Sequence, residues 1–280
     1  MKDTTRQGWK KFGWLCLSAV PMISYLILMM VVTVGIYAIL TVFALARGET
    51  DITGYLLGYA MHCGIAYALV GLVGYGLWYY FGCKKKRLLP PAGVCSIKNI
   101  LAVFAAAFGA NCVTSWLLAL AQMLLPDLIN DYSEMMEMAG IGNVTVAMVL
   151  YVVILGPILE ELIFRGLTFY YAKKFTKSFW IANVIQAVFF GIMHGNLVQG
   201  AYAFILGLFL GWVYEKFQSL YATIWMHIGY NFLGSGILSL VFGEDVSIPF
   251  QIAWNLLGIA LLVVGVFVIC KRDAKQAPVG

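Results

Sequence analysis

Long apolar runs alternate with short polar segments along most of the chain. Several runs exceed about 18 residues, the length at which an α-helix crosses about 30 Å of hydrocarbon. The runs are continuous, whereas the strands of a membrane β-barrel alternate polar and apolar residues over short segments. The pattern therefore predicts an all-α fold, a polytopic membrane bundle of about eight transmembrane helices. These helices are expected at residues 18–45, 54–82, 99–125, 142–165, 179–195, 198–214, 219–241 and 250–270.

The composition agrees with a chain that lies in lipid. Hydrophobic residues make up 62% of the sequence and charged residues only 11%, against about 25% charged residues in an average soluble domain. The six cysteines are scattered without a CxxC pair. We interpret them as packing residues, with no disulfide framework or zinc ribbon implied.

Basic residues cluster on one side of the predicted bundle. If the helices cross alternately, the two terminal segments and the loops 83–98, 166–178 and 215–218 share one side. Together with Arg165 they hold all but Arg47 of the 18 Lys and Arg residues. Cytosolic loops are enriched in Lys and Arg, so we predict a multi-pass protein of the cell membrane with both termini in the cytosol. The net charge of +5 follows from this asymmetry and does not indicate nucleic-acid binding.

The chain divides into two predicted segments. Residues 1–98 form an N-terminal two-helix membrane segment, and residues 99–280 form a core whose polar motifs lie within 145–235. The basic start followed by an apolar run looks like a signal peptide, but the run is too long for one. We interpret it as a retained first membrane helix.

Two features point to packing rather than to chemistry. Ala203, Gly207 and Gly211 are spaced four residues apart, which predicts a face that a neighbouring helix approaches closely. His62 has no polar residue at helical spacing, so we expect it to be a packed or hydrogen-bonded core histidine.

Two carboxylates and an arginine lie inside one apolar run. Glu161 and Arg165 are four residues apart, so on a helix they share a face and can pair. Glu160 points about 100° away, which leaves it free for acid–base chemistry. A charge in hydrocarbon costs at least about 2.5–3.5 kcal/mol, so either a function or an ion pair that locks two helices together must justify these residues. The predicted topology puts them toward the cytosolic end of the fourth helix.

Two other apolar segments carry polar side chains one helical turn apart. His194 follows Phe190 by four residues, and Asn231 follows His227 by four. Each could serve only as a polar contact between helices, but three such spans together favour hydrolysis. Glu160 would be the base, His194 would orient the same water, and His227 with Asn231 would donate to the oxyanion. His194, His227 and a carboxylate would equally suit a zinc ion, and the residues leave this choice open.

These motifs resemble those of a known family. The CPBP family comprises the CAAX prenyl endopeptidases and the bacterial Abi bacteriocin-processing and immunity relatives. The resemblance covers about residues 145–235, and no motif position departs from the family pattern. The three matching motifs are Glu160-Glu161-x-x-x-Arg165, Phe190-x-x-x-His194 and His227-x-x-x-Asn231.

The resemblance implies an eight-helix intramembrane endopeptidase whose active cavity opens toward the cytosol. Glu160 and His194 would then activate water, and His227 and Asn231 would form the oxyanion site. The supporting residues would be Glu161, Arg165 and Phe190. The family has been described both as metalloproteases and as glutamate-type proteases, so a divalent metal such as zinc is an open alternative.

The implied substrates are membrane-associated or prenylated CAAX-type proteins, or bacteriocin-type or signal-type peptides. Two other classes of function compete with this one. Intramembrane Glu, His and Arg also mark transporters and proton relays, but the sequence contains neither inverted repeats nor broken helices. A catalytically silent regulator or immunity scaffold would have degraded motifs, and these motifs are intact.

Overall fold

The computed structural model describes residues 2–83, 93–141, 143–243 and 246–271, with side chains from residue 8 onward. Every regular element in this part of the chain is helical. The basic run at 84–87, the acidic pair at 244–245 and the tail after residue 271 lie outside the described residues. The elements are α1 (Lys2–Ala46), α2 (Ile52–Leu57), α3 (Ala60–Trp78), η1 (Tyr79–Cys83), α4 (Ile97–Leu124), α5 (Pro126–Met138), α6 (Val146–Met148), η2 (Val149–Leu155), α7 (Gly156–Glu161), η3 (Leu162–Thr168), α8 (Phe169–Thr176), α9 (Phe179–Met193), α10 (Leu197–Phe217), α11 (Leu220–Gly234), α12 (Ser239–Phe242) and α13 (Ile248–Cys270), where η denotes a π-helical segment.

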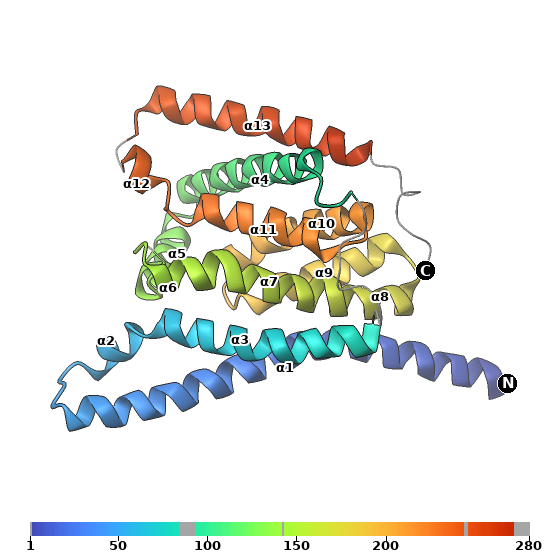
Figure 1. The fold of residues 1–280 in the computed structure, drawn as a ribbon, viewed down its shortest axis with the longest axis horizontal. Helices are drawn as coiled ribbons and strands as arrows, with labels where there is room; N and C mark the ends of the chain where they lie inside the picture. Colours follow the sequence, from blue (N-terminus) through green and yellow to red (C-terminus); the bar gives the residue numbers. More distant parts are fainter. Residues whose placement is uncertain (1, 84–92, 142, 244–245, 272–280) are drawn as a thin grey trace.

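The long helices lie roughly side by side in a bundle (Figure 1). α13 and α4 form one outer layer, and α1 and α3 form the opposite one. α7, α10 and α11 lie between these layers. α1 begins and α13 ends at the same end of the bundle, as expected for an even number of crossings.

The predicted polytopic helical bundle is confirmed, because each of the eight predicted segments contains a helix. Within the described residues, six continuous helical stretches are long and apolar enough to cross a membrane by length and composition. α9 and α11 are shorter, with 15 residues each. At 1.5 Å per residue they extend about 22 Å, less than the thickness of the hydrocarbon layer. These two short helices carry the histidine motifs.

The predicted end of the fourth helix at residue 165 is wrong. The helical stretch runs without a break from Val146 to Thr176, over 31 residues, and ends where Lys177 adopts a left-handed conformation (φ 55°). Arg165 does not mark an interface, because it is fully buried and paired within the bundle. Glu160 therefore lies near the middle of the stretch and not toward its end.

Other predicted boundaries also shift. α1 begins at Lys2 and contains 45 residues, so it starts well before the predicted residue 18. The helix predicted at 219–241 ends at Gly234, and the short α12 follows separately.

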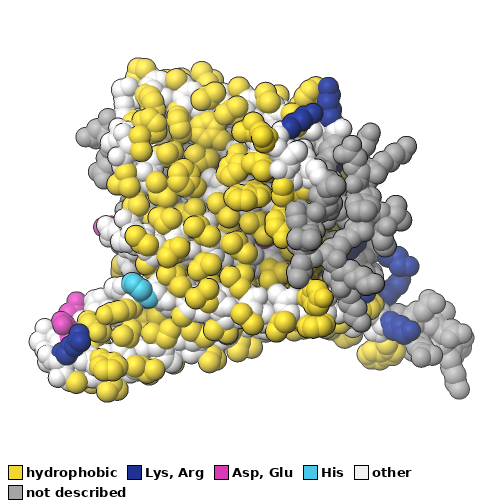
Figure 2. Space-filling view, in the orientation of Figure 1, with side chains coloured by type: hydrophobic (Ala, Val, Ile, Leu, Met, Phe, Trp, Pro, Cys, Tyr) yellow, Lys and Arg dark blue, Asp and Glu magenta, His cyan; other side chains and the backbone are white. Residues whose placement is uncertain are grey.

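Figure 2 shows apolar side chains over most of the face between the two ends of the bundle. Lys and Arg side chains gather mainly at the end where α1 begins and α13 ends, and Asp and Glu side chains at the other end. This separation matches the charge pattern of the sequence. Which end faces the cytosol stays a prediction.

The expectation for His62 is wrong, because its side chain is exposed. Its ring lies 5.6 Å from the ring of Tyr59 on the preceding turn. The absence of polar residues at helical spacing therefore indicated an isolated histidine, not a buried one.

The predicted close approach along α10 is confirmed, and the neighbour is α9. A Cβ on Gly207 would lie 3.1 Å from Ala187 Cα, and a Cβ on Gly191 would lie 2.7 Å from Gly200 O. Small residues on both helices let their backbones meet, which is the usual role of such a face in membranes.

Candidate active site

The paired carboxylates end a short α-helical piece, α7, that has a π-helical segment on each side. A π-helical turn contains an extra residue and is frequent at functional sites. Gly156 and Pro157 open α7. Gly156 N–H bonds Tyr151 O, five residues back, and a Cβ at Gly156 would lie only 2.9 Å from that oxygen. Glycine thus fits the wide turn.

Pro157 makes a backbone acceptor available to the site. In a π-helical turn the carbonyl of Val152 would pair with the N–H five residues later, but that residue is Pro157, which has no N–H. Asn231 on α11 donates to Val152 O instead, at 2.9 Å. Pro157 therefore leaves Val152 O free to accept from the amide of Asn231, 79 positions after Val152.

Glu161 is the centre of a buried ion-pair network. Its Oε1 accepts a hydrogen bond from Arg165 Nη1 at 2.8 Å, so the predicted pair is present. The same oxygen lies 2.8 Å from His227 Nδ1. The side chains of Glu161 and Arg165 are fully buried, and that of His227 is 3% exposed. Charges buried to this extent are tolerated only when they are paired and hydrogen-bonded.

Phe190 connects the network to both histidines. Arg165 lies over its ring, with the guanidinium carbon 4.5 Å from the ring centre, a cation–π arrangement. The ring meets His194 edge to face at 5.0 Å and His227 at 5.7 Å. Arg165 Nη2 also donates to Gly207 O at 3.3 Å, which ties the network to α10.

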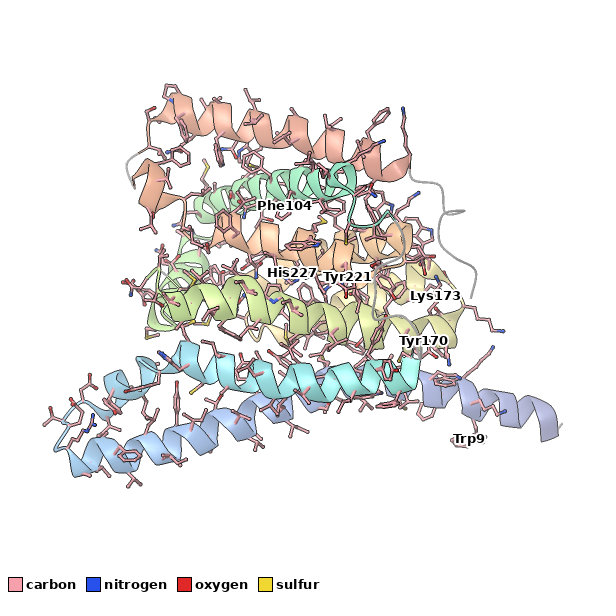
Figure 3. All side chains as sticks on the ribbon, in the orientation of Figure 1. Trp9, Phe104, Tyr170, Lys173, Tyr221 and His227 are labelled. Atoms are coloured by element: carbon pink, nitrogen blue, oxygen red, sulfur yellow. The ribbon has the colours of Figure 1, made fainter. Side chains whose placement is uncertain are left out.

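Glu160 is placed differently from its neighbour. Its side chain is 15% exposed, and its Oε2 lies 3.6 Å from His227 Nε2. The imidazole of His227 therefore stands between two carboxylates, with Nδ1 toward Glu161 and Nε2 toward Glu160. Figure 3 shows His227 reaching from α11 toward α7.

His194 caps the C-terminus of α9, immediately before Gly195, whose φ is +72°. The left-handed conformation suits glycine and lets the chain turn into α10. His194 Nδ1 lies 2.8 Å from Phe190 O, so it donates to this carbonyl. The neutral ring then presents the lone pair of Nε2 to water or substrate.

The structure brings the candidate residues together from three helical stretches. Glu160 and His227 are near neighbours, and Phe190 links His227 to His194. Asn231 lies one turn after His227 on the side of α11 that faces η2. A carboxylate, two imidazoles and an amide that lie near one another are groups able to take part in the hydrolysis of an amide bond.

Two buried amides near the site escaped the sequence analysis. Gln186 Nε2 on α9 donates to Gly207 O at 2.8 Å, and Asn183 Nδ2 donates to Leu208 O at 3.0 Å. Both side chains are buried. Their spacing of three residues on an otherwise apolar helix was the signal that would have found them.

A cluster of tyrosines was also missed. Tyr25 and Tyr67 lie ring to ring at 6.0 Å, and Tyr67 and Tyr151 at 5.5 Å with their hydroxyls hydrogen-bonded. The Tyr151 ring and Glu160 Oε1 each lie 3.9 Å from the point where a Cβ on Gly156 would be, so the cluster borders Glu160. The three tyrosines come from different elements of a chain with 16 tyrosines, so the sequence contains no signal for them.

The arrangement does not fit a zinc site. Among the described residues, no group of three or more His, Cys, Asp and Glu side chains is placed to hold a metal ion. Nδ1 of His227 faces Glu161, and Nδ1 of His194 faces a carbonyl. The two Nε2 atoms and the carboxylate of Glu160 are the groups that would remain for a metal.

Known proteins are similar to this chain over the part that contains the candidate site residues. The family model described as "Type II CAAX prenyl endopeptidase Rce1-like" matches residues 142–233. A Bacillus subtilis (strain 168) protein, named "Putative membrane peptidase YdiL", is 33% identical over 78 residues, which are 28% of this chain and 32% of that protein. The chain therefore spans about a third of the length of this curated relative. No solved structure matches the chain.

Proposed function

We infer, from the match of residues 142–233 to the CAAX prenyl endopeptidase family model and from the similarity to a putative membrane peptidase, that this chain is a member of the CPBP family and an intramembrane endopeptidase. The observation that carries the proposal is the unequal environment of the two adjacent glutamates. Glu161 is fully buried and bound to Arg165, whereas Glu160 is partly exposed and faces a histidine. Such a pair can divide a structural role from a catalytic one.

In the proposed reaction Glu160 is the general base. It takes a proton from a water molecule as the water attacks the carbonyl carbon of the scissile peptide bond. His194, with its Nε2 lone pair, accepts a hydrogen bond from the same water and orients it. A base acts on a proton within hydrogen-bonding distance, so the water is expected between these two side chains.

His227 and Asn231 would stabilise the oxyanion. Arg165 balances the charge of Glu161, and a protonated His227 would balance Glu160. The imidazolium offers Nε2–H to the developing oxyanion. Glu160 passes the proton that it took from water to the leaving amine as the C–N bond breaks, so both side chains end in their starting forms. The amide of Asn231 uses one N–H for Val152 O and keeps a second N–H for the same oxyanion.

Glu161 and Arg165 would act as positioning residues. Glu161 Oε1 lies 2.8 Å from His227 Nδ1 and so fixes the orientation of the ring, as the carboxylate of a catalytic triad does. Arg165 pairs with Glu161 inside the bundle, 2.8 Å from its Oε1. Phe190 supports Arg165 and separates the two imidazoles.

The proposed substrates are peptides or proteins associated with the membrane. The matched family model is named for CAAX prenyl endopeptidases and the relative is named as a membrane peptidase. Prenylated CAAX-type proteins and bacteriocin-type or signal-type peptides are therefore the two classes to test. We also propose that both termini face the cytosol.

Comparing the peptides in membranes that contain wild-type protein with those containing Glu160→Gln tests the proposal. Glutamine keeps the shape of Glu160 but is not a base, so cleavage products should be present only with the wild type. His62→Gln, at an exposed position, is the matched control and should give the wild-type products. Identical peptides with wild type and Glu160→Gln, at equal amounts of folded protein, would contradict the proposed activity.

A further inference from the structure

Four buried side-chain atoms in the described part of the chain have no hydrogen-bond partner. Two belong to the ion pair, one to a side chain that shares a backbone acceptor with Arg165, and one to a residue three positions after Arg165. They are Glu161 Oε2, Arg165 Nε, Thr168 Oγ1 and Gln186 Oε1. All four side chains are fully buried. Unpaired buried atoms are rare and costly in native proteins, so four of them on Glu161, Arg165, Thr168 and Gln186 require an explanation.

Arg165 and Gln186 meet at one backbone oxygen. Arg165 Nη2 donates to Gly207 O at 3.3 Å, and Gln186 Nε2 donates to the same oxygen at 2.8 Å. Their unpaired atoms, Nε and Oε1, therefore belong to side chains anchored at one point on α10. Thr168 lies three residues after Arg165 in the same π-helical segment.

The orientation of the Gln186 amide is fixed by its other contacts. Nε2 also lies 2.8 Å from Asn183 Oδ1 and 3.0 Å from Asn183 O. Three acceptors around one nitrogen leave no reason to exchange the nitrogen and oxygen of the amide. Oε1 is therefore a true acceptor without a donor.

The unpaired atoms together match one kind of ligand. Arg165 Nε–H donates, Glu161 Oε2 and Gln186 Oε1 accept, and the Thr168 hydroxyl does both. The arginine disfavours a cation, and the carboxylate disfavours an anion. Water has two donors and two acceptors, and buried water typically makes about three hydrogen bonds to polar groups that would otherwise be unpaired.

We propose that ordered internal water binds between Arg165, Gln186 and Thr168 and hydrates the Glu161–Arg165 ion pair inside the membrane. The site is distinct from the water that Glu160 would activate. It goes beyond the proposed peptidase activity and does not depend on it. Its role is to complete the hydrogen bonding of Arg165 and so to hold Glu161 and His227 in place.

An experimental density map of the wild-type protein, detailed enough to show water at other buried polar groups, tests the site directly. We expect a water peak within hydrogen-bonding distance of both Arg165 Nε and Gln186 Oε1. A map that shows water elsewhere in the interior but no peak here would overturn the proposal.

The sign of a stability change gives a second test. Thr168→Val removes the hydroxyl and keeps the shape of the side chain. If the hydroxyl binds water, the variant should melt several degrees lower than the wild type, and Thr168→Ser should melt near the wild type. If the hydroxyl is truly unpaired, its removal is neutral or stabilising, and an unchanged or higher melting temperature would refute the proposal.

Thr41→Val is the control for this substitution. The hydroxyl of Thr41 donates to Tyr37 O within its own helix at 2.8 Å. The loss of melting temperature at Thr168 should exceed that at Thr41, and an equal or smaller loss at Thr168 counts against bound water. No peptide hydrolysis is needed for either test, so failure of the water site and failure of the proposed activity are separate results.

Discussion

Two helix contacts in this bundle both depend on small residues, but one brings backbone atoms together and the other also holds buried amide side chains. Between α4 and α13, a Cβ on Gly265 would lie 2.7 Å from Ala102 O and 2.8 Å from Ala106 N. Backbone meets backbone there. Between α9 and α10, a Cβ on Gly211 would overlap Asn183 Oδ1 and lie 2.8 Å from Gln186 Nε2. In that contact the space left by glycine is filled by buried amides.

The difference shows what a small-residue pattern can and cannot indicate. Glycine and alanine at four-residue spacing indicate where two helices approach closely. They do not indicate whether the contact is apolar or polar. The α4–α13 contact serves packing, whereas the α9–α10 contact also supports Arg165 through the carbonyl of Gly207.

The largest effect is expected from breaking the ion pair beside the polar contact. Arg165→Ala leaves the carboxylate of Glu161 buried and unpaired, which should cost about 3–5 kcal/mol. We expect a strong loss of folded protein and of peptide hydrolysis. Thermal unfolding in detergent, together with the yield of monodisperse protein, measures this effect.

Lys173→Ala is the control for that prediction. Lys173 pairs with Glu215 at 2.7 Å, but the two side chains are 39% and 32% exposed. An exposed pair contributes about 0–1 kcal/mol, so this variant should fold with nearly wild-type stability. An equal loss of thermal stability in both variants would show that burial does not determine how much each ion pair contributes to stability.

A smaller effect is expected from adding a methyl group to each close contact. Gly265→Ala and Gly211→Ala should each destabilise by about 1–3 kcal/mol, the usual cost of overpacking. Only Gly211→Ala displaces Asn183 and Gln186, so only this variant should also lower kcat per folded molecule. If Gly265→Ala lowers kcat as much, the two contacts are not functionally different.

The smallest effect is expected at a glycine that contacts nothing. A Cβ on Gly74 in α3 would meet no atom within 4 Å. Gly74→Ala should leave hydrolysis unchanged and raise stability slightly, by at most about 1 kcal/mol, because alanine is the better helix former. A marked loss of stability would mean that this face packs against a partner.

The parts of the fold that depend on local sequence could be predicted. Apolar runs gave the helices, and four-residue spacing gave the pairing of Glu161 with Arg165. The end of the fourth helix could not be predicted, because Arg165 reads as an interfacial residue until its buried partners are known. The π-helical turns around Gly156 and Pro157 depend on packing against α11 as much as on these two residues.

The residues of the candidate site could be predicted from the sequence, but the contacts between them could not. The contact between Glu161 and His227 joins residues 66 positions apart and depends on how α11 docks. The bond from Asn231 to Val152 O requires the wide turn at Pro157. Gln186 and the tyrosines near Glu160 act through contacts between helices, which periodicity in one helix does not describe.

The central claim is that the adjacent glutamates have different roles, and parallel glutamine variants test it most directly. Glu160→Gln and Glu161→Gln are purified in detergent, and melting temperature and hydrolysis of a peptide found in the membrane comparison are measured for each. Glu160→Gln should melt near the wild type and cleave nothing, whereas Glu161→Gln should melt markedly lower because Arg165 loses its partner. Near-wild-type turnover by Glu160→Gln, with a stable but inert Glu161→Gln, would mean that the base has been assigned to the wrong carboxylate.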